Sequence, residues 1–204
     1  MKRVAVLASG RGSNLGALLA AQATFSTYRV VLLVSNLEAS GALVLARARG
    51  VEAVLAPSRG ISRQDHEQTI LAALNSRAID LVCLAGYMRV LGSHFILASG
   101  RPILNIHPSL LPAFPGMHAQ RQALEAGVRW SGATVHFVDS GLDTGPIILQ
   151  EPVPVESDDS EDSLSARILE IEHRLYPQAV DLVARDAYEI EGRRVYLCGG
   201  KEAR

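Results

Sequence analysis

Short apolar runs alternate along this chain with longer segments of helical spacing, and this alternation constrains the fold more than any other feature. Parallel neighbouring strands need a crossover connection, which is usually a helix, so this order is typical of a parallel sheet covered by helices. The sequence therefore predicts an α/β fold with a Rossmann-like, mostly parallel twisted sheet. The expected strands are residues 4–8, 30–35, 51–55, 81–85 and 103–106, and the expected helices are residues 14–22, 41–49, 62–77 and 93–98.

The last 90 residues follow a different pattern. Two strand-like segments follow each other directly, separated only by the turn-rich residues 139–146, which favours antiparallel strands late in the chain. A long helical segment then carries acids in its first turn and Pro177 in its interior, where a kink is expected. The expected elements here are a helix at 118–125, strands at 133–138 and 147–155, a helix at 160–186 and a hairpin within 188–197.

Composition narrows the class of protein. A length of 204 residues suits one α/β domain. A formal net charge of -1 argues against nucleic acid as a partner, and no apolar run approaches the roughly 20 residues of a bilayer span. The two cysteines, Cys83 and Cys198, match no metal or redox spacing. We therefore expect a cytoplasmic protein that binds neither nucleic acid nor membrane.

Asn105 and His107 stand two residues apart in a short extended segment that stops at Pro108. Side chains alternate faces along a strand, so the amide and the imidazole should lie on one side of it. A hydrogen-bond donor beside a titratable ring suits a carbonyl that becomes an oxyanion when it is attacked. An isolated pair of this kind is more often an ordinary strand end than a catalytic site. Its interpretation therefore depends on the other motifs of the chain.

A glycine loop, Ser9-Gly10-Arg11-Gly12-Ser13-Asn14, joins the first strand to the first helix. Free N–H groups at a helix start can bind an anion. A dinucleotide fingerprint would need glycine at Leu15, and the lysine of a nucleotide-triphosphate loop is absent. The loop therefore fits either a phosphate monoester or an ordinary capped turn.

The roles of Asp143 and of the remaining histidines do not follow from each residue taken alone. A lone aspartate in a turn is usually structural, although a carboxylate near an imidazole can orient it or hold it charged. His66 lies in a helix rich in polar residues and is expected to be exposed, and His136 lies within a strand and is expected to be structural.

Several blocks of sequence occur in order across almost the whole chain: residues 12–15, 86–91, 105–112, 115–118 and 142–146, and the pairs Glu172-His173 and Tyr176-Pro177. Together they resemble the phosphoribosylglycinamide formyltransferases (GAR transformylases), a folate-dependent formyltransferase family of purine synthesis. The resemblance implies a single domain over residues 1–204. In it, about residues 1–100 bind the phosphoribosyl substrate and about residues 101–204 complete a folate cleft.

The resemblance also implies roles for individual residues. Asn105, His107 and Asp143 are the implied catalytic residues. Gln120 departs from the family pattern, since some relatives have a second histidine at this place. The other implied residues are Gly12, Ser13, Asn14 and Glu172 for the substrate phosphate and ribose, Arg63, Met88, Arg89, Val90, Leu91 and Asn105 for the folate, and His118 and His173 in supporting positions.

The implied reaction transfers the formyl group of 10-formyltetrahydrofolate to the amine of 5-phosphoribosylglycinamide (GAR), giving formyl-GAR and tetrahydrofolate in de novo purine (IMP) biosynthesis. The amine attacks directly, without a metal, and Asn105 and a protonated His107 stabilise the oxyanion. In this scheme Asp143 raises the pKa of His107. The formylfolate serves as co-substrate, the partners are small molecules, and the protein is a monomer or a homodimer.

Three other functions remain open. A 10-formyltetrahydrofolate hydrolase is expected to have a regulatory domain before the catalytic one. A methionyl-tRNA formyltransferase is expected to have a further nucleic-acid-binding domain and a more basic surface. A non-catalytic phosphosugar-binding module would keep the glycine loop but would have no need for Asn105, His107 and Asp143 together.

Overall fold

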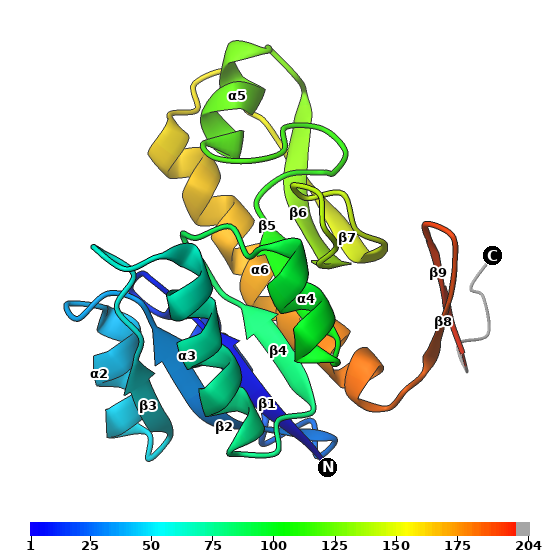
Figure 1. The fold of residues 1–204 in the computed structure, drawn as a ribbon. Helices are drawn as coiled ribbons and strands as arrows, with labels where there is room; N and C mark the ends of the chain where they lie inside the picture. The colour runs from blue at the N-terminus through cyan, green and yellow to red at the C-terminus, as the bar shows by residue number, and fades with distance from the viewer. Residues whose placement is uncertain (199–204) are drawn as a thin grey trace.

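The computed structural model describes residues 1–198 and contains one large sheet covered by helices on both faces (Figure 1). The elements in chain order are β1 (Lys2–Leu7), α1 (Ser13–Ala21), β2 (Tyr28–Ser35), α2 (Gly41–Ala48), β3 (Glu52–Leu55), α3 (Arg63–Asn75), β4 (Leu81–Leu84), α4 (Ser93–Ser99), β5 (Ile103–His107), α5 (Ala119–Glu125), β6 (Trp130–Phe137), β7 (Ile147–Pro154), α6 (Glu161–Ala184), β8 (Tyr188–Glu191) and β9 (Arg194–Leu197).

The predicted fold class is confirmed. The sheet has the strand order β3-β2-β1-β4-β5-β6-β7, in which the first five strands of this order pair in parallel and β6 and β7 pair antiparallel. Every predicted strand and helix is present, with ends shifted by a few residues. The hairpin of β8 and β9 forms a separate antiparallel pair that projects from the body of the molecule (Figure 1). The end of the tail, at 199–204, lies outside the described residues.

Side chains alternate between the two faces of each strand, so the sheet has a hydrophobic core on each of its faces. In β1, Val4 and Val6 face the core beneath α1, α2 and α6, whereas Ala5 and Leu7 face the core beneath α3 and α4. Strands buried on both faces have to be apolar throughout, which explains the continuous apolar runs of the sequence. No helix within residues 1–198 combines the length and apolarity that a bilayer crossing requires.

Parallel strands place their carboxyl ends at one edge of the sheet, and ligands of open α/β sheets bind there. At this edge β1 leads into the glycine loop, β4 leads into residues 86–92, and β5 ends at His107. One edge of the sheet therefore brings together three of the segments in which the sequence places candidate functional residues.

Candidate active site

Strand β5 presents Asn105 and His107 on the same face, as predicted from the strand period. Leu104 and Ile106 fill the core on the opposite face, so the two polar side chains point the other way. Beyond His107 the chain leaves the sheet through a loop that contains a cis peptide bond before Pro112. The amide and the imidazole therefore lie at the carboxyl edge of the sheet.

Asp143 reaches this pair from the tight loop between β6 and β7. Its backbone is left-handed (φ 53°), a conformation that aspartate tolerates better than most residues. The loop folds closely onto β6, because a β-carbon added at Gly145 would lie 1.8 Å from the carbonyl oxygen of Phe137. Asp143 Oδ2 accepts a hydrogen bond from the Gly116 N–H at 2.8 Å, which fixes the carboxylate from a third segment.

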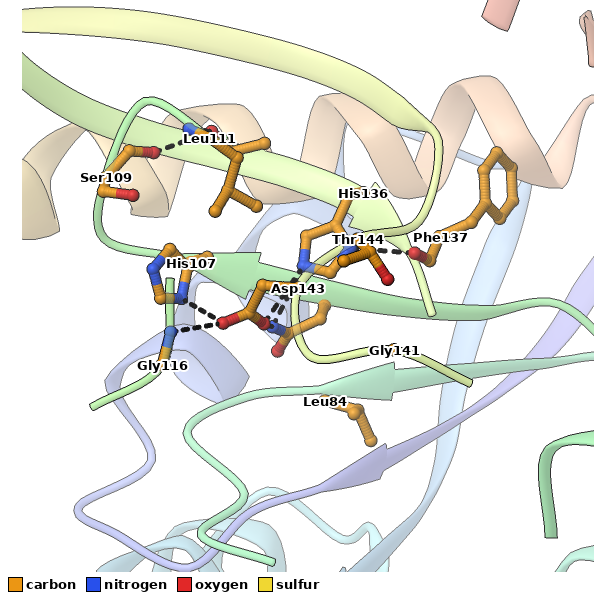
Figure 2. A network of polar contacts seen from close by, with 12 residues as sticks. Leu84, His107, Ser109, Leu111, Gly116, His136, Phe137, Gly141, Asp143 and Thr144 are labelled. Atoms are coloured by element: carbon orange, nitrogen blue, oxygen red, sulfur yellow. Dashed lines mark hydrogen bonds and ion pairs between the residues drawn. The ribbon is translucent and has the colours of Figure 1, made fainter. Parts of the chain in front are cut away.

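The structure brings the three predicted catalytic side chains together. His107 Nδ1 lies 3.4 Å from Asp143 Oδ2 (Figure 2). Asn105 Nδ2 lies 3.4 Å from Asp143 Oδ1. The carboxylate thus contacts the imidazole with one oxygen and the amide with the other. Their catalytic roles stay predictions, but their proximity is a property of the fold.

His136 belongs to the same cluster, and reasoning from the sequence missed it. The antiparallel register pairs His136 of β6 with Asn105 of β5. Asn105 Nδ2 lies 3.2 Å from His136 Nε2, and His136 Nδ1 lies 2.8 Å from the carbonyl oxygen of Phe137. The carbonyl can only accept, so Nδ1 carries a proton. Nε2 faces both the Asn105 amide and Asp143 Oδ1, which lies 3.7 Å away, so His136 contacts both side chains.

The Asp143 carboxylate raises the pKa of His107, as expected, but it does not determine the net shift. Burial lowers the pKa of His107, and the Phe114 carbonyl and the Asp143 carboxylate, which both favour the charged ring, offset this only in part. The net shift of the His107 pKa is downward because a ring that is almost fully enclosed loses its hydration. Burial alone would also raise the pKa of Asp143, but contacts with His136, the Gly116 N–H and His107 outweigh it and lower that pKa to about 2.

A cavity of about 470 Å³ opens beside the cluster. Residues 86–91 form one wall, and residues 105–108, 116–118 and 141–143 form the others. Of the predicted folate residues, Met88, Arg89, Val90, Leu91 and Asn105 line it, and so do His118 and Gln120. The cavity is of the size that ligand sites commonly have.

The predicted phosphate residues lie two strands away, at the start of α1. Gly12 precedes the helix with a left-handed backbone (φ 87°), and a β-carbon there would come within 2.8 Å of the Ala42 Cα. Buried Asn14 donates through Nδ2 to Glu172 Oε2 at 2.8 Å, which links α1 to α6. Burial raises the pKa of Glu172. Gly12, Ser13, Asn14 and Glu172 therefore form one neighbourhood.

Three of the predicted site residues lie at the edge of the cavity or outside its lining. Arg63, at the start of α3, is not among the cavity-lining residues, but its side chain passes near Gly92, next to the cavity wall of residues 86–91. His118 Nδ1 lies 4.0 Å from Glu161 Oε1 at the cavity rim. His173, on α6, does not line the cavity, and its buried Nε2 has no hydrogen-bond partner within residues 1–198.

The described part of the chain, residues 1–198, holds no group of three or more His, Cys, Asp or Glu side chains that could bind a metal ion. The expected reaction without a metal stays a prediction. Cys83 is buried and Cys198 is exposed, and both are free thiols.

Comparison with known proteins connects this site to a family. Residues 2–180 match the model of the formyl transferase family. The phosphoribosylglycinamide formyltransferase of Escherichia coli (strain K12) is 40% identical over 198 residues, which cover 96% of this chain and 93% of that protein. The crystal structure of glycinamide ribonucleotide transformylase 1 from Symbiobacterium toebii superposes with a TM-score of 0.94 at 46% identity, covering 97% of this chain and 94% of that one.

A longer relative shares the same domain. The trifunctional purine biosynthetic protein adenosine-3 of Drosophila melanogaster is 46% identical over 186 residues, which are 89% of this chain but only 14% of that protein. This chain therefore corresponds to one part of the trifunctional protein and to nearly all of the bacterial enzyme. The chain belongs to the formyl transferase family, and within it to the phosphoribosylglycinamide formyltransferases.

Proposed function

We propose that this chain transfers the formyl group of 10-formyltetrahydrofolate to the amine of GAR, giving formyl-GAR and tetrahydrofolate in de novo purine biosynthesis. One observation carries the proposal: an amide, an imidazole and an ionised carboxylate meet at the wall of a cavity large enough for a folate head group. The family of the chain agrees with this chemistry.

The reaction is an acyl transfer between two nitrogens. The GAR amine forms a bond to the formyl carbon, the carbonyl electrons move onto oxygen, and the bond to N10 breaks as the oxyanion collapses. The proton of the attacking amine has to reach N10. His107, held by the Asp143 carboxylate, stands where it can take up and return that proton.

In the free protein Asn105 and His107 contact other groups of the chain, and some of these contacts have to be replaced by contacts with the substrates. Asn105 directs its amide N–H groups to His136 and Asp143 over 3.2 and 3.4 Å, and His107 Nε2 lies 2.9 Å from the Phe114 carbonyl oxygen. The Asn105 contacts are long, so they are weak. In the proposed complex, the formyl oxygen replaces one of them and is stabilised by the amide as its negative charge develops.

Each substrate is held by its own set of residues, and both sets include residues from the two halves of the chain. The Gly12 and Ser13 amides, the Ser13 hydroxyl and Asn14 hold the phosphate of GAR, and Glu172 contacts its ribose. Residues 88–91 hold the folate, with Arg63 at its glutamate tail and His118 and His173 in support. The free thiols of Cys83 and Cys198 fit a reducing cytoplasm, and a monomer or a homodimer suits a site built within one chain.

The test is formyl transfer measured with both substrates and with each one alone. Product that requires both substrates supports the transferase. Tetrahydrofolate released without GAR identifies a hydrolase, and binding of GAR without turnover identifies a phosphosugar-binding module. We expect His107→Ala and Asp143→Asn each to lower kcat by about 10²–10³ with little change in substrate affinity. Near-normal turnover in either variant would contradict the assigned roles.

A further inference from the structure

Residues 86–92, here called the folate loop, contain no helix or strand, and residues 86–91 of this loop form one wall of the cavity. Gly86 begins it with a left-handed backbone (φ 68°), and the side chains of Met88 and Val90 are 69% and 64% exposed. Leu91 packs into the core, but a loop without a helix or strand needs further anchors from neighbouring elements if it is to keep one shape. Those anchors come from α3, which lies beside α4 on the same side of the sheet (Figure 1).

His66 of α3 is the first anchor. It is only 2% exposed, which contradicts the expectation of a surface residue. Its Nε2 lies 2.5 Å from the Tyr87 hydroxyl, its Nδ1 lies 3.2 Å from the Pro57 carbonyl oxygen, and the two rings are parallel to within 8°. The carbonyl can only accept, so Nδ1 carries the proton and Nε2 accepts from Tyr87. Burial lowers the pKa of His66 and so favours this neutral ring.

Glu67, the next residue of α3, is the second anchor. Its carboxylate is buried and accepts a hydrogen bond from the Gly92 N–H at 2.7 Å. A β-carbon at Gly92 would lie 3.2 Å from the same oxygen, so the loop approaches the helix closely. On the other side, the Ser9 hydroxyl accepts from the Met88 N–H at 2.9 Å. The loop is therefore held near its start, its middle and its end.

We propose that His66 is a positioning residue for formylfolate: it fixes Tyr87, and with it the cavity wall of residues 86–91, without touching either substrate. This inference rests on the proposed function, since it assumes that the cavity holds the folate. Through this contact His66 sets the affinity for formylfolate, while Asn105, His107 and Asp143 set the rate of the chemical step.

Two substitutions at His66 separate its two contacts. His66→Gln places an amide oxygen near the position of Nε2 and can still accept from Tyr87. His66→Asn places its amide nitrogen near the position of Nδ1 and keeps only the contact with Pro57. Tyr87→Phe removes the hydroxyl and nothing else. Each variant is measured by its KM for formylfolate, its KM for GAR, its kcat and its unfolding temperature.

We expect His66→Asn and Tyr87→Phe each to raise the KM for formylfolate by about tenfold, because each leaves a buried polar group unpaired. The kcat at saturating formylfolate and the KM for GAR should stay within about twofold of wild type, and His66→Gln should restore most of the affinity. The double variant His66→Asn/Tyr87→Phe should lose no more than either single variant, since the second change removes the stranded partner.

Three results would overturn the proposal: equal changes in both KM values, a fall in kcat with an unchanged KM for formylfolate, or strictly additive losses. A variant that unfolds below the assay temperature is replaced by Tyr87→Phe, which leaves the helix intact. Failure here is distinct from failure of the proposed function, because the wild-type chain would still transfer formyl groups to GAR.

Discussion

His107 is held between two oxygens and is also cut off from water, and these two effects oppose each other. Both ring nitrogens face acceptors, the Asp143 carboxylate and the Phe114 carbonyl, so only the imidazolium satisfies both contacts at once. Burial acts in the other direction and lowers the pKa of His107. A ring in this balance can gain and lose a proton during one catalytic cycle, which suits a proton carrier better than a permanent cation.

The titration of His107 gives a direct test at the residue scale. We expect its pKa, followed by NMR of the ring carbon-bound protons, to lie below the usual value of about 6.5. Asp143→Asn should lower it further, because the carboxylate favours the charged ring. Above this pKa the ring is neutral, so the free protein carries a neutral His107 at pH 7.5. A pKa above 6.5 in the wild-type protein would contradict this account.

The carboxyl group of Glu172 is buried, so its ionised form reduces the stability of the folded protein. Burial raises the pKa of its carboxyl group, so the folded chain holds the proton longer than the unfolded chain does. Stability is therefore lost as the pH rises from the unfolded value through the folded one. We expect Glu172→Gln to raise the free energy of unfolding by about 1 kcal/mol at pH 8 and by less at pH 5, while GAR binds more weakly.

The control for this prediction is Glu170→Gln on the same helix, where the side chain is exposed. It should change neither the unfolding temperature nor the binding of GAR measured by calorimetry. If Glu172→Gln loses stability at pH 8, the carboxylate is better satisfied in the free protein than its one contact with Asn14 indicates.

At the scale of elements, the junction of β1 with α1 depends on Gly12. The left-handed backbone there costs an ordinary residue about 1–2 kcal/mol, and the Ala42 Cα leaves no room for a β-carbon. We expect Gly12→Ala to destabilise the protein by at least about 1–2 kcal/mol and to weaken GAR binding by about tenfold or more. Denaturant unfolding and calorimetry measure the two effects.

Gly16 provides a matched control within the same helix. A β-carbon there would meet only the Leu45 side chain at 3.6 Å, an ordinary contact. Gly16→Ala should therefore stabilise α1 by up to about 1 kcal/mol and leave GAR binding unchanged. If both substitutions weaken GAR binding equally, the effect belongs to α1 as a whole and not to the shape of the loop.

At the scale of the whole molecule, the hairpin of β8 and β9 contacts β7 and the end of β6. The Tyr188 ring lies 5.1 Å from the Phe137 ring, centroid to centroid, and the family match ends at residue 180, before the hairpin. We expect Tyr188→Ala to reduce the free energy of unfolding by about 1–2 kcal/mol while formyl transfer at 25 °C persists. Tyr196→Ala, at a more exposed position, should have a smaller effect.

A different result for Tyr188→Ala would connect the hairpin to the candidate site. Phe137 also accepts a hydrogen bond from His136 through its carbonyl oxygen, so it links the hairpin to the site. A loss of kcat in Tyr188→Ala with unchanged stability would mean that the hairpin controls the geometry around Asn105.

Local patterns account for the residues that the sequence predicted well. The parallel strands are buried on both faces, so they had to be continuous apolar runs, and Asn105 and His107 share a face because strand side chains alternate. His66 could have been placed correctly too, since it continues the buried stripe of Ile70, Ala73 and Leu74 at helical spacing. The polar residues on either side of His66 in the sequence made this buried stripe hard to recognise.

The amino-acid sequence by itself determined the order of the elements, the parallel sheet and the two polar side chains at the end of β5, because these follow from periods of two and 3.6 residues along the chain. Only the tertiary structure decided that β6 lies antiparallel to β5 and places His136 opposite Asn105, that Asp143 folds back onto His107, and that α3 holds the folate loop. Those contacts join residues 21 to 36 positions apart in the sequence, and no local sequence pattern encodes pairing over such separations. Burial by the whole fold also lowers the pKa of His107, and the loss of water around a side chain cannot be read from its sequence neighbours.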